Sequence, residues 1–411
     1  MTASLVALAA LNAAAGCAKL VGLTGDYELE DGATGGAGGT GEAVGGEGGD
    51  PRGGAGGASG SAGVAPGGMS GSGPSGGTDA GGGTDAGGGG TDAGGGTGAG
   101  GGTGGSMGGT AGGGGVPPDE PPSCDGVPRE CGPTGDDSCC ESVEIQSGTF
   151  NRSNDARYPA TVSGFRLDIY EVTVARFRTF VDATNGVYRP EPGSGKNPNI
   201  EDDPGWDAAY TDELPISRAE LVGSDVGVVC EPPFPTWTAV PGDNERRPIN
   251  CVTWYLAYAF CIWDGGRLPS EAEWNFAAAG GRQQRHYPWS VPATSTELDS
   301  TRASYQDVML GTCVGDGADG CTVNDFVFVG TKPAGNGRWG NADLAGNVWE
   351  WTVDADAPYV EECVDCATFT GSQRIGRGGG YISGPGLLRT DSRVGFAPTY
   401  RSSAFGIRCA R

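Results

Sequence analysis

Arg247 to Gly281 reads RPINCVTWYLAYAFCIWDGGRLPSEAEWNFAAAGG, and this stretch carries the clearest secondary-structure signals of the chain. Trp254 to Trp263 predicts a helix with apolar and aromatic residues on one side. Ser270, with Glu273 three residues later, predicts a capping box at the start of another helix, and Gly280 is expected to end that helix. Two short helices therefore lie close together in the sequence, with a turn between them.

Residues 165–184 change period within a few residues. Phe165, Leu167 and Ile169 alternate as in a strand, and an apolar series from Val174 to Val181 then recurs at helical spacing. Most of the remaining chain after about Glu141 is rich in Gly, Pro, Asn and Asp. The sequence therefore predicts an irregular, loop-rich α+β fold of roughly 270 residues. This length suits one large domain, although two domains of ~130 residues would also fit.

The charge is strongly acidic, with 51 Asp and Glu against 26 Lys and Arg, for a formal net charge of -25. This balance argues against nucleic acid and anionic membrane surfaces as partners. An acidic surface can simply keep an exported protein soluble, or it can serve a cation or a basic partner.

The N-terminal region is expected to consist of a targeting signal followed by a flexible tether. Residues 1–17 resemble a bacterial lipoprotein signal peptide, because an apolar run ends in small residues before Cys17, the expected lipidation site. No Lys or Arg precedes that run, so an ordinary cleaved signal, or no signal, is the alternative. Residues 18–116 are expected to form a disordered, glycine-rich tether. These features predict an exported protein, lipid-anchored in a bacterial cell envelope at the outer membrane or the periplasmic face.

Twelve of the 13 cysteines follow the glycine-rich tract. An even number in an exported chain predicts up to six disulfides. Four of them crowd into residues 117–141, where a small disulfide knot is expected, and a zinc site is the alternative. These four are Cys124, Cys131, Cys139 and Cys140.

Several motifs occur in a fixed order between Ser142 and Arg411. They are GTF, LDIYEVTVARFRTFV, the stretch quoted above, HYPWS, DLAGNVWEWTVD, RGGGY and FGIRCAR. In this order they resemble the formylglycine-generating enzyme family, also called sulfatase-modifying factors. The resemblance implies that residues 142–411 form the family's variant of the C-type lectin-like fold.

The resemblance also implies a redox site, and this chain departs from it. Family enzymes oxidise a sulfatase cysteine to formylglycine with oxygen and copper, which two cysteines hold after a Gly-Gly-Ser-Tyr run. Here that run is Gly378–Tyr381, with Gly380 at the serine position. The first cysteine position falls on Ser383 and the second within Pro385–Leu388, and no cysteine occurs from 367 to 408. We therefore do not expect copper binding, and we expect the domain to be a pseudoenzyme.

Disulfides and calcium follow from the same resemblance. It implies a Cys261–Cys409 disulfide, while the family's other structural pair falls on Ala278 and Thr390, which leaves Cys230 and Cys251 free to pair. From the residues themselves, Cys313 with Cys321 is expected to be a loop staple. Cys363 and Cys366 form a C-x-x-C that either closes a small disulfide or is redox-active. The family's calcium positions fall on Asp343, Gly346, Val348 and Glu350. Asp343 and Glu350 could instead bond turn amides without metal.

Three functions remain open at this point. The first is a non-catalytic binding or scaffold domain for an unknown protein or an anionic ligand. Its expected cleft residues are Arg377, Tyr381, Arg389, Arg393 and Arg401. The second is an oxidoreductase that generates formylglycine on sulfatases, or performs related oxygen chemistry. The third is a structural envelope protein. The lone histidine, His286, argues against a Ser-His-Asp hydrolase.

Overall fold

The computed structural model describes residues 121–411. The predictions for the signal peptide, the lipidated Cys17, the tether and the first residues of the cysteine-rich segment lie outside these residues. Four α-helices are present in the described part: α2 (Val174–Thr184), α3 (Arg218–Leu221), α4 (Trp254–Trp263) and α5 (Glu271–Ala278). Among residues 121–411, no helix has the length and apolar character needed to cross a bilayer.

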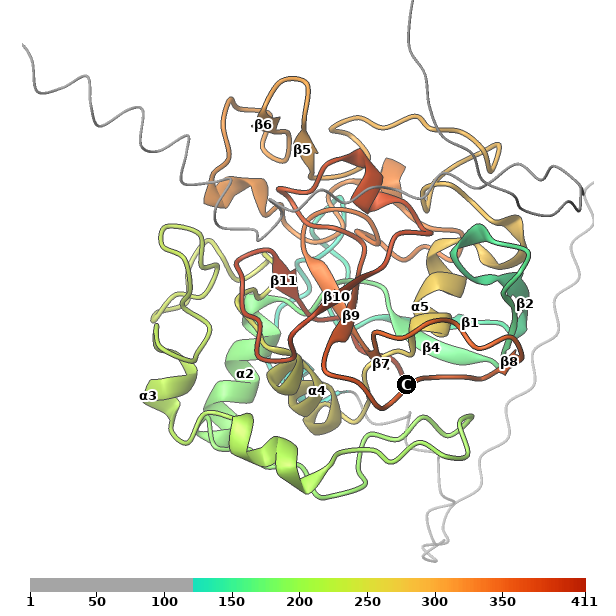
Figure 1. Ribbon diagram of the computed structural model, residues 1–411. Coiled ribbons are helices and arrows are strands. Elements are labelled where there is room, and N and C mark those ends of the chain that lie inside the picture. The colour runs from blue at the N-terminus through green and yellow to red at the C-terminus, as the bar shows by residue number, and fades with distance from the viewer. Residues whose placement is uncertain (1–120) are drawn as a thin grey trace, which may run out of the picture. The chain divides into compact units, whose positions relative to one another are not determined.

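The strands are short and form four small sheets (Figure 1). The four-stranded sheet has the order β10–β9–β7–β11, with β11 parallel to β7. Its strands are β7 (Trp349–Ala355), β9 (Arg374–Arg377), β10 (Val394–Phe396) and β11 (Phe405–Gly406). A three-stranded sheet joins β2 (Gly148–Asn151), β3 (Pro159–Val162) and β8 (Cys363–Val364). The two remaining pairs are β1 (Ser142–Ile145) with β4 (Phe165–Asp168), and β5 (Gln306–Asp307) with β6 (Thr312–Cys313).

Much of the chain is irregular, as the sequence predicts. Seven 3-10 turns interrupt the loops of the described residues: Pro122–Cys124, Arg152–Asn154, Ala208–Glu213, Gly281–Gln283, Val323–Asp325, Pro333–Gly335 and Pro385–Leu388. The domain is therefore a loop-rich α+β structure.

Local capping explains where the helices start. The Thr173 side chain accepts the Arg176 amide at α2, and the Thr253 side chain accepts the Leu256 amide at α4. Ser270 and Glu273 form the predicted capping box of α5. Gly280 follows that helix with a positive φ of 67°, which suits glycine.

Helix α4 is buried more completely than the predicted one-sided pattern implies. Seven of its ten residues are buried. It packs against α2 and against β7, so apolar side chains are required on more than one face. Aromatic rings fill this core, as in the stacked pair Phe177–Phe260, whose ring centroids lie 5.8 Å apart.

Six disulfides join all twelve cysteines of the described residues. The pairs are Cys124–Cys140, Cys131–Cys139, Cys230–Cys251, Cys261–Cys409, Cys313–Cys321 and Cys363–Cys366. The cysteine-rich segment is a disulfide knot rather than a zinc site, because none of its sulfurs is a free thiolate. It packs on the domain through Ser123, whose amide donates to Asp264 and whose hydroxyl accepts from Arg176.

Candidate functional site

The glycine run after β9 is held against the acidic turn that precedes β7. Gly378 and Gly379 adopt positive φ values of 90° and 71°, a conformation that side chains disfavour. The Gly346 amide donates to the Gly378 carbonyl at 3.0 Å, and the Tyr381 amide donates to the Asn347 carbonyl at 2.8 Å. Two motifs about 30 residues apart in the sequence therefore form one site.

The positions predicted from the resemblance for two redox cysteines, Ser383 and one within Pro385–Leu388, carry no sulfur. Ser383 is buried, and its hydroxyl accepts the Gly380 amide at 2.9 Å, which closes a tight turn. Leu388 is buried in an apolar cluster with Tyr287 and Tyr305. Because all twelve cysteines of residues 121–411 are in disulfides, this part of the chain offers no free thiolate in its oxidised form.

The acidic turn gathers more negative charge than the sequence reading recognised. Glu350 accepts from Arg408 through both carboxylate oxygens and from the Trp274 indole nitrogen at 2.7 Å. Asp343 Oδ2 accepts the Gly330 amide at 2.6 Å. The carboxylate of Glu171, in the segment before α2, accepts hydrogen bonds from the Asn347 side chain and from the Val348 amide.

Burial and neighbouring carboxyl groups shift the pKa values of this cluster toward the protonated forms. Burial raises the pKa of Glu171 well above its ordinary value, and the neighbouring Asp343 and Glu350 raise it further. Burial also raises the pKa of Asp343. Three buried carboxyl groups, those of Glu171, Asp343 and Glu350, are opposed by two cations, because Arg408 pairs with Glu350 and both Arg408 and Lys332 act to lower the pKa of Asp343. An all-oxygen set with surplus negative charge suits a hard divalent cation such as calcium, so these residues fit the metal.

Asp168, Asp264 and Cys409 also lie together, with one possible ligand atom from each within 4.8 Å of the others. Both carboxylates are already paired with Arg176 and Arg411. The Cys409 sulfur is bonded to Cys261. We therefore assign this cluster to the core, where it joins α2, the end of α4 and the C-terminal segment.

The arginines expected to line a cleft have separate internal partners. Arg377 is fully buried and forms an ion pair with Glu271, so its guanidinium does not face solvent. Arg389 pairs with Asp391, and Arg393 lies 3.4 Å from Asp356.

The last two expected cleft residues are also engaged. Arg401 donates to backbone carbonyls of residues 224–227. Tyr381 is buried, and its ring lies 4.1 Å from that of Phe326. A cavity of about 480 Å³ lies elsewhere, between the cysteine-rich segment and α2, with Val127 and Arg178 in its lining.

Sequence reasoning missed two features near the glycine run. Two guanidinium groups lie against the Tyr359 ring, with Arg152 4.4 Å and Arg393 4.5 Å from its centroid, and the Tyr359 hydroxyl donates to Glu271. The second feature is the tip of the β5–β6 hairpin, where three apolar side chains are exposed. The apolar run at 308–310 is visible in the sequence, but nothing there distinguishes it from a buried strand.

His286 lies in a loop and is partly buried beside Tyr287, with ring centroids 4.6 Å apart. Burial and the nearby Arg389 lower the pKa of its imidazole. Asp391 acts on the imidazole electrostatically, but no carboxylate of residues 121–411 is hydrogen-bonded to it and orients it as a catalytic base.

This fold and this site define a family. The family model described as "Sulfatase-modifying factor enzyme 1-like domain" matches residues 128–411, and the chain belongs to this family. The chain is 29% identical over 304 residues to the formylglycine-generating enzyme of Mus musculus, covering 65% of this chain and 74% of the relative. It is 31% identical over 279 residues to the formylglycine-generating enzyme of Thermomonospora curvata, covering 61% and 82%.

A further relative carries a different name. The "Inactive C-alpha-formylglycine-generating enzyme 2" of Bos taurus is 30% identical over 287 residues, covering 65% of this chain and 87% of the relative. The family thus includes proteins named as active and as inactive, and membership alone does not decide between them.

Proposed function

We propose that this chain is a non-catalytic member of its family and that its domain binds a protein partner. The observation that carries the proposal is the chemistry of the 378–388 loop. A hydroxyl and an aliphatic side chain occupy the positions at which the family pattern has cysteines, and neither binds cuprous ion as a thiolate does. All twelve cysteines of residues 121–411 are already in disulfides.

The β5–β6 hairpin supports a binding role for the face beside this loop. Val308, Met309 and Leu310 at its tip are 62%, 93% and 73% exposed. Consecutive exposed apolar residues are unfavourable in water unless a partner covers them. The Gln306 amide donates to the Ser383 carbonyl at 3.0 Å, so the hairpin is attached to the cysteine-free loop.

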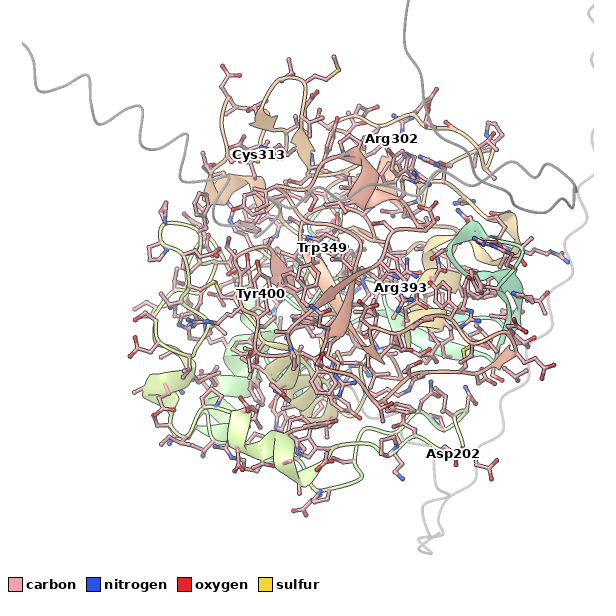
Figure 2. All side chains as sticks on the ribbon, in the orientation of Figure 1. Asp202, Arg302, Cys313, Trp349, Arg393 and Tyr400 are labelled. Carbon is pink, nitrogen blue, oxygen red and sulfur yellow. A yellow bond between two sulfur atoms is a disulfide. The ribbon has the colours of Figure 1, made fainter. Side chains whose placement is uncertain are left out.

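The hairpin is built as a fixed projection. The Asp307 carboxylate accepts the Met309 and Leu310 amides, at 2.9 and 3.2 Å, which orders the tip. The Cys313–Cys321 disulfide closes the adjoining loop. In Figure 2, Cys313 marks the base of the hairpin, whose tip projects away from the four-stranded sheet. An ordered tip loses little conformational entropy on binding.

The charge around the tip indicates the kind of partner. Residues 306–321 contain three aspartates and no Lys or Arg. A protein with an apolar pocket and a basic rim would complement this surface. An anionic ligand is the less favoured alternative, because the cleft arginines already have internal partners.

The six disulfides indicate an oxidising compartment, outside the cytosol. We further infer that Cys17 anchors the chain to a bacterial envelope membrane through lipid, and that calcium binds at the acidic turn. The surplus of buried carboxyl groups supports the calcium site. The support for the anchor is the sequence of residues 1–17.

The second candidate is an oxidoreductase that generates formylglycine, favoured by the names of the relatives at 29–31% identity. A direct assay separates the two. The purified full-length chain, with its disulfides intact, is incubated with a Cys-x-Pro-x-Arg peptide and oxygen, with and without cuprous ion. Mass spectrometry then measures conversion, with the mouse relative as positive control. We expect no conversion above the no-enzyme background, and reproducible conversion would overturn the proposal.

The binding role has its own test. A photo-crosslinking residue replaces Met309 in the full chain, and a matched control places it at Val240, which is 73% exposed on a different loop. We expect an identified envelope protein to crosslink at position 309 and not at position 240. Equal labelling at both positions, or none at 309, would contradict a docking role for the hairpin.

A further inference from the structure

The C-x-x-C disulfide lies on the loop between β7 and β9, outside the glycine run. Cys363 belongs to β8, which pairs with β3, and is only 3% exposed, whereas Cys366 is partly exposed. The Asp365 carboxylate accepts from the Ser163 amide at 2.6 Å and from its hydroxyl at 2.7 Å. Asp365 is therefore held in place, and Cys366 is the more exposed cysteine of the pair.

A buried guanidinium lies against this sulfur. Arg152 is only 3% exposed, and its Nη1 donates to Cys366 Sγ at 3.5 Å. Its Nη2 donates to the Val360 carbonyl, and its Nε has no hydrogen-bond partner. Burial lowers the pKa of Arg152, and a buried charge is costly unless it is paired.

The other buried arginines of residues 121–411 make the contrast clear. Four of them are paired with carboxylates: Arg176, Arg267, Arg377 and Arg408. Arg374 has no carboxylate, but it donates to three oxygens and has no unpartnered buried nitrogen. Arg152 likewise forms no ion pair with a carboxylate, although the charge of Asp354 acts to raise its pKa. Unlike Arg374, it has a buried nitrogen without a hydrogen-bond partner, and its guanidinium contacts the sulfur of Cys366.

We propose that Cys363–Cys366 is a thiol–disulfide exchange site that acts on dithiols of other proteins, with Arg152 as the counter-ion of the Cys366 thiolate. Reduction converts the neutral sulfur beside Arg152 into an anion that can pair with this guanidinium. Stabilising the reduced form makes a disulfide a better oxidant. Three carboxylates oppose a thiolate here. Glu361 and Glu362 are exposed and screened by water, and Asp365, next to Cys366, accepts hydrogen bonds from the amide and hydroxyl of Ser163.

The reaction is a two-electron exchange. A thiolate of the external dithiol attacks Cys366 Sγ, the Cys363–Cys366 bond breaks, and Cys363 leaves with the electron pair and takes a proton from solvent. The second thiolate of the external molecule then attacks the external sulfur of the mixed disulfide. This step releases the Cys366 thiolate beside Arg152. The protein disulfide is reduced to two thiols, and the external dithiol is oxidised to a disulfide.

The test measures the exchange equilibrium of the full-length chain. The oxidised protein is equilibrated in glutathione buffers of graded reduced-to-oxidised ratio, quenched in acid, alkylated and analysed by peptide mass spectrometry. We expect Cys363–Cys366 to open at a ratio at which Cys313–Cys321, a loop disulfide to which no guanidinium of residues 121–411 is hydrogen-bonded, remains closed. If the two disulfides opened together, or Cys363–Cys366 opened later, the proposal would be refuted.

Arginine variants test the role of the cation. In Arg152→Met, the reduced-to-oxidised glutathione ratio at which half of Cys363–Cys366 is open should be at least tenfold higher than in the wild type. In Arg152→Lys the increase should be smaller. Arg157→Met is the matched control, because Arg157 is exposed and pairs with Asp155 on the same loop. Equal midpoints for the wild type and Arg152→Met would sink the proposal.

A second readout does not depend on the redox midpoint. In Cys363→Ser, ultraviolet absorbance reports the titration of the Cys366 thiolate. That titration should move to higher pH when Arg152→Met is added, and an unmoved titration would count against the counter-ion role. The site lies outside the 378–388 loop, so the exchange and peptide-conversion assays can fail independently.

Discussion

Removal of the Cys261–Cys409 disulfide should be the most destabilising loss of a cross-link in this domain. The bond joins α4 to the segment after β11, and both cysteines are fully buried. The two residues are 148 positions apart, the largest separation of the six pairs. The double variant Cys261→Ala/Cys409→Ala breaks the bond without leaving a buried thiol.

The magnitude follows from the entropy of the unfolded chain. For a separation of 148 residues, loop closure contributes about 5 kcal/mol to the free energy of unfolding at 25 °C. For Cys313–Cys321, with a separation of 8, the same relation gives about 2.5 kcal/mol. The two double-alanine variants should therefore differ by roughly 2–3 kcal/mol, apart from the packing cost at the buried site.

Equilibrium unfolding in urea, followed by tryptophan fluorescence, measures both losses. The Cys261/Cys409 variant should also unfold with a steeper urea dependence, because its unfolded chain is less constrained and exposes more surface. If the two variants lost the same stability within about 1 kcal/mol, the chain-entropy argument would be refuted for this domain.

Two further predictions concern buried carboxyl groups. Calcium should raise the thermal midpoint of the full chain, and more at pH 8 than at pH 5, because the raised pKa values of Glu171 and Asp343 favour their protonated forms at low pH. Asp343→Asn should remove most of that rise, and an undiminished rise would contradict the site. Glu350→Ala is a poor test, because it leaves Arg408 buried without its carboxylate and should by itself lower the stability of the fold by about 3–5 kcal/mol. Burial raises the pKa of Asp354 to about 7. Between about pH 4 and 7 the folded state therefore binds a proton that the unfolded state has lost. The free energy of unfolding should fall as pH rises through this range, by up to about 4 kcal/mol. Urea titrations across this range should give a flatter profile for Asp354→Asn, and parallel profiles would show that another group is responsible.

The elements that the sequence predicted well depend on neighbours in the chain. The capping box of α5 needs only Ser270 and Glu273, three residues apart, and the structure has both of its hydrogen bonds. The strand predicted to include Ile169 ends at Asp168 in β4, one residue earlier. Capping hydrogen bonds and side-chain periodicity involve residues close together in the sequence, so they can be predicted without knowing the tertiary contacts.

The candidate site was predicted less completely. The acidic turn was identified, but Glu171 was not, because it approaches the turn from a segment more than 170 residues earlier. The arginine Arg377 looked available in the sequence and is buried against Glu271. Whether a charged side chain faces solvent or a partner depends on contacts that periodicity does not encode.

The sequence by itself determined the covalent facts: no cysteine lies between residues 367 and 408, and twelve cysteines follow the glycine-rich tract. Only the tertiary structure decided which groups meet, as when it brought Arg152 to Cys366 across 214 residues and left the guanidinium without a carboxylate. The reason is physical. Ligand type is a property of a residue, whereas the free energy of a buried charge depends on what the folded chain places beside it.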